Sequence, residues 1–184
     1  DIEELRQLMK AEGADIPIIA KIEKSEAIAH LIEIRDAADG MMVARGDLGI
    51  EVHPQEVPLL QKRIIRACND VGKPVITATQ MLQSMVDHPR PTRAEASDVA
   101  TAVFEGTDAV MLSGETASGA HPELVVRMMT RIVPEAEISA YYNPLPSEVP
   151  GVRANVAEAI ARNACDIARD IGARFIVAFT EAGN

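Results

Sequence analysis

The chain has 184 residues, of which 47% are hydrophobic and 25% are charged, a composition typical of a globular protein and unlike that of a disordered or fibrous one. Its net charge is −10, with no Trp, two Tyr and three Phe, so it lacks the cationic surface and the stacking side chains that nucleic acid binding requires. It has no apolar run of about eighteen residues and no basic start followed by an apolar segment, so we expect no membrane span, no signal peptide and a cytoplasmic location.

Apolar segments of strand length alternate along the chain with segments of helical period. Strands are predicted over residues 16–22, 40–44, 74–78 and 109–112. These segments are apolar almost throughout, whereas a strand with one solvated face would alternate apolar and polar residues. The pattern therefore predicts parallel strands that are buried on both faces beneath covering helices.

The helices are predicted from their capping signals. Thr92 and Glu95 form a capping box at the start of one helix, and Pro122 opens another. Pro134 should end or kink that second helix, because proline lacks the N–H that the helix needs. The remaining helices of the first domain are predicted over residues 2–11, 26–35 and 54–70.

A change of pattern divides the chain into two domains. Residues 142–151 contain three prolines and have no period, so they are predicted to be a linker between residues 1–141 and 152–184. The second segment begins with an Ala-rich helix over residues 155–171 and a strand over 174–179. Four β/α units are half of the eight that close a barrel. The predicted fold is α/β: a partial TIM (β/α)₈ barrel of about four units with parallel strands, followed by the first helix and strand of a second α/β domain.

Charged residues follow the first two predicted strands. Lys21 and Glu23 are two residues apart in the first strand, so both side chains should lie on one face at its C-terminal end, as a buried ion pair that is either structural or functional. Asp47 follows the second strand, either as a turn residue or as a second carboxylate at the same edge. Because carboxylate oxygens suit Mg²⁺, we expect Glu23 and Asp47 to be metal ligands.

The other strand ends carry polar groups as well. Thr79 follows the third strand, and Ser113 and Glu115 follow the fourth. Gly46, before Asp47, either makes a tight turn or lets main-chain N–H groups approach an anionic ligand. A lysine, carboxylates and a threonine hydroxyl at one edge predict a metal-dependent site that handles a phosphate or an enolate.

At these residues the sequence resembles the pyruvate kinase family. The resemblance is carried, in the family's order, by residues 18–28, 42–49, 73–81, 89–95 and 111–116. It implies the second half of the catalytic (β/α)₈ barrel and the start of the C-terminal regulatory domain. It also implies a glycolytic phosphotransferase whose parent enzyme transfers a phosphoryl group from phosphoenolpyruvate to ADP, giving pyruvate and ATP.

The resemblance also implies roles for individual residues. Glu23 and Asp47 match the carboxylates that hold Mg²⁺, and Lys21 matches the lysine that stabilises the phosphoryl group in transit. Gly46 and Asp47 match the positions whose main-chain N–H groups receive the substrate carboxylate. Thr79 matches a substrate-contacting threonine associated with protonation of the enolate. The resemblance implies a homotetrameric parent that requires K⁺.

The family's other catalytic parts have no counterpart among these residues. Its first four barrel strands, its lid domain, its K⁺ ligands and its phosphate-contacting arginine are absent from the chain, so we expect the 184-residue chain alone to be inactive. Two alternatives stay open. One is another Mg²⁺-dependent barrel enzyme that acts on phosphoenolpyruvate or pyruvate, a lyase or a mutase. The other is a catalytically silent fragment.

Overall fold

The computed structural model describes residues 1–139, 141–142 and 156–179, which fall into two compact units, Asp1–Pro146 and Ser147–Asn184. The first unit contains the parallel sheet and the helices that cover it. The second contains α9 (Val156–Asp170) and the segment that follows it. The predicted linker over residues 142–151 lies almost wholly outside the described residues and stays a prediction. None of the described helices is long and apolar enough to cross a membrane.

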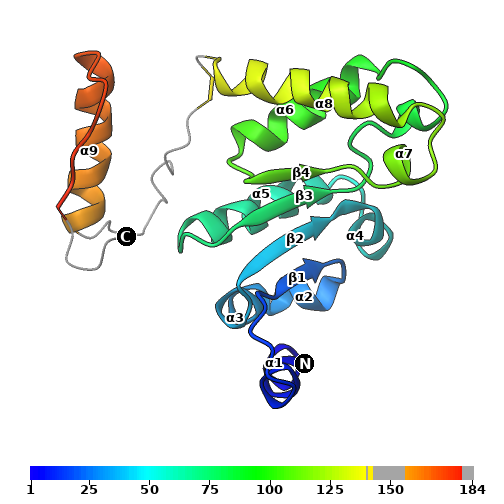
Figure 1. Ribbon diagram of the computed structural model, residues 1–184, viewed down its shortest axis with the longest axis horizontal. Helices are drawn as coiled ribbons and strands as arrows, with labels where there is room; N and C mark the ends of the chain where they lie inside the picture. Colours follow the sequence, from blue (N-terminus) through cyan, green and yellow to red (C-terminus); the bar gives the residue numbers. More distant parts are fainter. Residues whose placement is uncertain (140, 143–155, 180–184) are drawn as a thin grey trace. The chain divides into compact units, whose positions relative to one another are not determined.

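Four parallel strands form the sheet of the first unit, in the order β1-β2-β3-β4. Their bounds are β1 (Ile19–Ile22), β2 (Gly40–Ala44), β3 (Val75–Ala78) and β4 (Ala109–Met111). Chain order equals spatial order, as in successive β/α units, and the strands end at one edge of the sheet (Figure 1). The predicted α/β architecture with four β/α units of a partial barrel is confirmed.

Helices precede, separate and follow the strands of the first unit along the chain. They are α1 (Ile2–Ala11), α2 (Ser25–Ala29), α3 (Leu31–Ala37), α4 (Arg45–Glu51), α5 (Val57–Asn69), the 3₁₀ turn η1 (Gln83–Val86), α6 (Arg93–Phe104), α7 (Gly114–Ala117) and α8 (Pro122–Glu137). The capping box at α6 is confirmed, because Thr92 Oγ1 accepts the Glu95 N–H and the Glu95 side chain accepts the Thr92 N–H. Pro122 stands in the first turn of α8, as expected.

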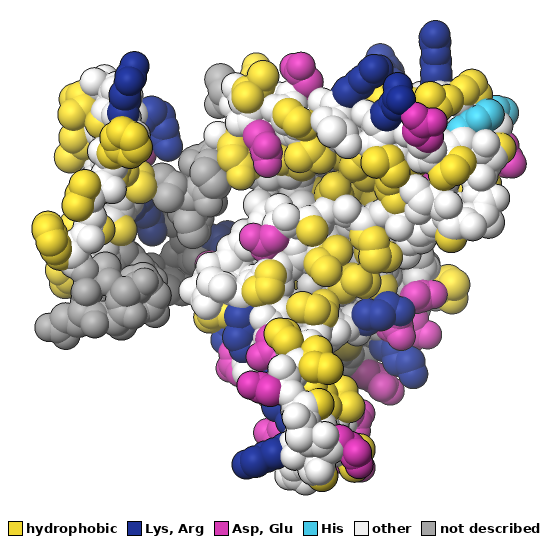
Figure 2. Space-filling model, in the orientation of Figure 1, with side chains coloured by type: hydrophobic (Ala, Val, Ile, Leu, Met, Phe, Trp, Pro, Cys, Tyr) yellow, Lys and Arg dark blue, Asp and Glu magenta, His cyan; other side chains and the backbone are white. Residues whose placement is uncertain are grey.

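The two faces of the sheet are buried to different extents, which corrects the expectation of two covered faces. Ile22, Val43 and Thr77 form one cross-strand row and are fully buried in the apolar layer beneath the helices. The row that begins with Lys21 and Met42 is half-buried to exposed. Figure 2 shows hydrophobic side chains exposed over the sheet. In a closed barrel this second face is the interior, which all eight strands fill together, and four strands leave it open.

Two helix predictions were wrong in their bounds. The helix predicted over residues 26–35 is divided at His30 into α2 and α3. Pro54 lies in a turn, and Pro58 takes the place in the first turn of α5 that Pro54 was expected to occupy. Both prolines suit a first turn, where a missing N–H costs nothing, so the sequence pattern did not distinguish them.

Pro134 does not end α8, which continues to Glu137. The missing N–H leaves the Thr130 carbonyl without its usual partner, but both residues are exposed, so water can satisfy that oxygen. Met129 and Ala136, on either side of the proline, are buried against the rest of the unit. Packing on both sides therefore keeps the helix continuous.

The strand predicted over residues 174–179 is absent, because this segment has no strand pairing. Phe175, Val177 and Phe179 are 86%, 79% and 98% exposed. A strand is stable only when a neighbour takes up its N–H and C=O groups, and the described residues of this unit supply no such neighbour. The preceding helix, α9, forms as predicted.

Candidate active site

Lys21 and Glu23 form an ion pair at the C-terminal end of β1. Lys21 Nζ lies 2.8 Å from Glu23 Oε2, and the side chains are 53% and 37% exposed. The expectation of a buried pair was therefore wrong, because Lys21 projects from the open face of the sheet. The hydrogen bond and charge of Glu23 raise the pKa of Lys21, and the same hydrogen bond and charge lower the pKa of Glu23. Both groups are thus charged around neutral pH.

Asp47 lies close to this pair because β2 is the neighbour of β1. It is exposed in the first turn of α4, which begins directly after β2. After the larger effect of Glu23, the negative charge of Asp47 also raises the pKa of Lys21. The pKa of Glu23 is lowered chiefly by Lys21, and a side-chain hydrogen bond with Asp47 makes the smallest contribution in the same direction. Two carboxylates and an ammonium group are therefore gathered at one edge of the sheet.

The donor set at this edge suits a hard cation that keeps open positions. Among the described residues no group of three or more His, Cys, Asp and Glu side chains could hold a metal. Glu23 and Asp47 offer two carboxylates, and Mg²⁺ commonly takes one or two from the protein while substrate oxygens and water fill the rest. The pair fits Mg²⁺ and does not fit a metal that needs a complete protein cage.

Gly46 and Thr79 connect the ends of β2 and β3. The Gly46 N–H donates a 2.7 Å hydrogen bond to Thr79 Oγ1, across 33 positions of sequence. A Cβ at position 46 would lie 3.4 Å from the same oxygen, which is an ordinary contact distance, so this hydrogen bond does not itself require glycine. Gly46 and Asp47 lie in the first helical turn of α4. The alternative prediction for these two residues was a tight turn outside a helix.

Thr79 has an unusual backbone conformation. Its φ is +67°, and the next residue, Gln80, has φ +55°. These are the only non-glycine residues with positive φ in the described part of the chain. Left-handed backbone is costly for a β-branched residue and is found mostly where surrounding contacts enforce it, often at functional sites.

Comparison of the chain with known proteins shows to which family it belongs. Residues 1–126 match the protein family described as "Pyruvate kinase, barrel domain". The chain belongs to the pyruvate kinase family. The pyruvate kinase of Staphylococcus epidermidis (strain ATCC 35984) is 49% identical over 185 residues, which cover all of this chain and 32% of that protein. The pyruvate kinase of Staphylococcus aureus (strain USA300) is 48% identical with the same coverage. The chain thus spans about a third of the length of these relatives.

Two residues of this pyruvate kinase barrel segment were not assigned a role by sequence analysis. Arg45, which directly follows β2, is buried and hydrogen-bonded to the loop after β3. Glu115 was noted only as one more polar residue at a strand end, yet it is fully buried. The signal for Arg45 was a charge adjoining an apolar strand, which requires a counter-charge elsewhere in the fold. Nothing local indicates where that partner lies.

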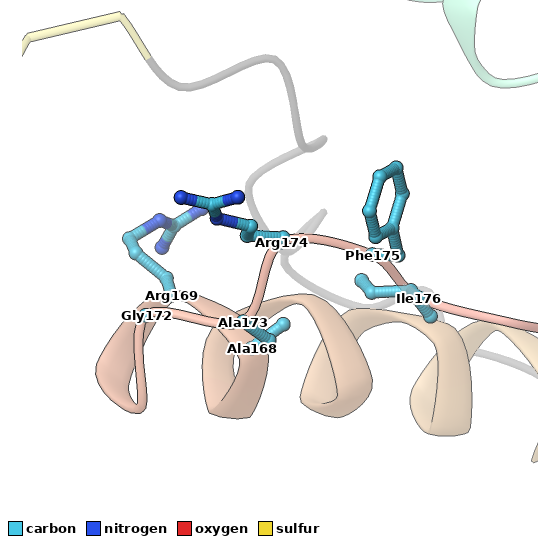
Figure 3. Close-up of a pocket in the computed structure, with 7 residues that line it drawn as sticks. All are labelled: Ala168, Arg169, Gly172, Ala173, Arg174, Phe175 and Ile176. Atoms are coloured by element: carbon cyan, nitrogen blue, oxygen red, sulfur yellow. The ribbon is translucent and has the colours of Figure 1, made fainter.

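Of two pockets on the surface of the described residues, one is lined by candidate site residues and the other is not. One of about 300 Å³ is lined by residues that include Lys21, Glu23 and His30. Another, of about 630 Å³, lies in the second unit between the end of α9 and the segment after it. Figure 3 shows Arg169 and Arg174 on the same side of this second pocket. None of the candidate site residues lines it.

Proposed function

We propose that this chain supplies part of the active site of an enzyme that transfers a phosphoryl group from phosphoenolpyruvate to ADP, giving pyruvate and ATP. The observation that carries the proposal is the Lys21–Glu23 pair beside Asp47, at the edge of a sheet that belongs to the pyruvate kinase barrel. Because the chain spans 32% of its curated relatives, reaction and substrates are proposed for the protein that carries it.

Lys21 is proposed to stabilise the phosphoryl group while it moves. Phosphoryl transfer spreads negative charge over the equatorial oxygens, and a fixed ammonium group lowers the energy of that state. Glu23 keeps Lys21 protonated and holds it on the open face of the sheet. The lysine therefore needs no rearrangement to meet a phosphoryl group there.

Glu23 and Asp47 are proposed as the protein ligands of Mg²⁺. When bound, the ion would supply charge neutralisation for the transferring group and for the enolate that transfer leaves behind. Lys21 and a bound cation would share Glu23, so this carboxylate would interact with both positive charges. The K⁺ requirement implied by the family rests on residues outside this chain.

Thr79 and the main-chain N–H groups of Gly46 and Asp47 are proposed to contact the substrate. Thr79 Oγ1 accepts the Gly46 N–H, so its own proton remains available to donate, which suits a group that helps to protonate an enolate. A substrate carboxylate that takes the Gly46 N–H must compete with Thr79 Oγ1. That competition would leave the threonine hydroxyl directly beside the bound substrate.

The test is release of pyruvate from phosphoenolpyruvate by the chain expressed with its flanking gene sequence, with and without ADP and with Mg²⁺ varied. The proposal expects no pyruvate without ADP, whereas a lyase or mutase would act on its substrate without ADP. Glu23→Gln should raise the Mg²⁺ concentration needed for half-maximal rate. Glu26→Gln, an exposed neighbour in α2, is the matched control and should not change it.

Location and assembly belong to the same proposal. A cytoplasmic enzyme accords with two cysteines that form no disulfide, Cys68 being buried and Cys165 half-buried. A homotetramer is proposed from the family resemblance, and light scattering after size-exclusion chromatography measures it.

A further inference from the structure

Arg45 is buried at the junction of β2 and α4, with 7% of its surface exposed. Its guanidinium group has five N–H donors, and all five have partners. One donor of Nε and one of Nη2 go to the Thr79 carbonyl, at 3.1 and 2.8 Å. The other donors go to Asp98 Oδ2 at 2.6 Å, Gln61 Oε1 at 3.3 Å and Met81 Sδ at 2.7 Å. Because the guanidinium group is planar and all of its donors are used, these contacts fix the orientation of the Arg45 side chain.

Two of the residues that hold the Arg45 guanidinium group belong to helices, α5 and α6. Asp98 belongs to α6 and supplies the counter-charge. Gln61 belongs to α5 and is itself held, because its Nε2 donates to Glu105 Oε2 at 2.8 Å. The guanidinium group is therefore hydrogen-bonded to side chains of α5 and α6, while two of its donors bind the Thr79 carbonyl in the loop after β3.

The carbonyl group that accepts these two hydrogen bonds from Arg45 belongs to Thr79, whose backbone conformation is strained. Thr79 and Gln80 both have positive φ, a backbone conformation that is energetically unfavourable for residues with a Cβ. An interaction with the Thr79 carbonyl oxygen opposes relaxation of this peptide to an ordinary conformation. The neighbour of Arg45, Gly46, contacts Thr79 a second time through Oγ1. Residues 45 and 46 thus hold Thr79 by its main chain and its side chain.

We propose that Arg45 is a positioning residue, whose guanidinium group holds Thr79 in its left-handed conformation and so aims the Thr79 hydroxyl into the site. The proposal rests on the proposed function, because it assigns Thr79 a task in the reaction. Arg45 touches no substrate in this scheme. Its effect on the reaction passes entirely through Thr79.

The test is a double-mutant cycle between positions 45 and 79 in the protein expressed with its flanking gene sequence. Arg45→Lys keeps a charge for Asp98 but cannot present a planar fork to the carbonyl. It should lower kcat about 10- to 100-fold, the value of a charge-assisted hydrogen bond, with little change in KM for ADP. Thr79→Val should lower kcat as well. The double variant should be no slower than the slower single variant, because both changes disable one group.

A backbone suppressor separates positioning from support of the core. Gln80 is exposed, and glycine adopts positive φ without steric cost, whereas alanine does not. Gln80→Gly should restore part of the kcat lost in Arg45→Lys, and the matched variant Gln80→Ala should not. Multiplicative losses in the double variant, or equal effects of glycine and alanine, overturn the proposal.

A readout independent of turnover distinguishes this proposal from the proposed function. Hydrogen exchange of the Gly46 amide, which donates to Thr79, should be faster in Arg45→Lys by at least about tenfold. Arg127→Lys, in an exposed ion pair on α8, is the control and should leave that amide unchanged. If the wild-type protein fails to transfer the phosphoryl group, the proposed function is wrong. If the wild-type protein does transfer the phosphoryl group, but Arg45→Lys leaves hydrogen exchange of the Gly46 amide unchanged, the proposed positioning of Thr79 by Arg45 is wrong.

Discussion

The carboxylate of Glu115, in the helical turn after β4, accepts a 3.2 Å hydrogen bond from the Leu82 N–H in the loop after β3. Its other oxygen accepts the Ser113 N–H at 2.8 Å. Glu115 is fully buried, so these N–H groups take the place of water for a carboxylate that has left solvent. The contact ties two adjacent strand ends of the candidate site to each other.

Glu115→Gln should therefore destabilise the chain. An amide of the same shape turns an NH₂ group toward one of the two backbone donors, which leaves a buried N–H unsatisfied, at a cost of about 1–3 kcal/mol. The free energy of unfolding in urea measures this cost. Glu135→Gln, exposed on α8, should stay within about 0.5 kcal/mol of the wild type. Equal values for the two variants would show that Glu115 does not carry these bonds.

Lys21→Met should lower kcat for phosphoryl transfer at least about 100-fold, since it removes a charge that acts on the developing charge of the transition state. Binding of phosphoenolpyruvate should change much less, because the ground state gains little from this contact. Steady-state kinetics of the protein expressed with its flanking gene sequence separates the two effects. Lys24→Met, three positions further along the chain, is the matched control. Near-normal kcat in Lys21→Met would remove Lys21 from the mechanism.

Glu95 should stabilise the fold at neutral pH and lose this effect in acid. Burial acts to raise its pKa, but hydrogen bonds from Ser84 and Thr92 outweigh it and lower the pKa from the ordinary 4.5. A lowered pKa contributes stability above pH 4.5, which disappears as the pH falls through the folded-state value. Glu95→Gln should cost about 1 kcal/mol near neutral pH, and the difference from the wild type should shrink in acid. Urea denaturation at several pH values measures it.

Cys68 should be unreactive in the folded chain. Burial raises the pKa of its thiol from 9.0 to about 11, so little thiolate exists at mildly alkaline pH. A thiol reagent should modify Cys165, which is half-buried, before Cys68. Because the unfolded chain releases this proton first, stability should fall as pH rises from 9.0 to about 11. Cys68→Ala should lack this slope, and equal modification of both cysteines would contradict the assignment.

Local sequence patterns predicted the strands and the residues at their ends. Apolar runs at the four strands and the capping box at Thr92 are interactions within a few positions, so the sequence displays them directly. Parallel strands joined by helices place every C-terminal end at one edge. That rule alone predicts that Lys21, Glu23 and Asp47 lie near each other. Their roles in catalysis stay predictions.

Patterns that depend on a distant partner were wrong or missing. Pro134 was expected to end or kink its helix, and it does not end it, because the local rule does not include the packing of Met129 and Ala136 that keeps α8 continuous. The final strand, residues 174–179, was expected from its composition, but a strand also needs a neighbour. Lys21 and Glu23 were expected to be buried, and the open face of the sheet leaves them partly exposed.

By itself the sequence determined the β/α alternation, the order of the strands and which residues stand at their ends, since helical period, strand length and capping are properties of neighbours along the chain. Only the tertiary structure decided that Arg45 grips Thr79, which is 34 positions away, and that Glu115 is buried against the loop after β3. A buried charge can be met by any partner that the fold brings within about 3 Å. That distance is set by how the strands and helices pack, which no short segment of sequence contains.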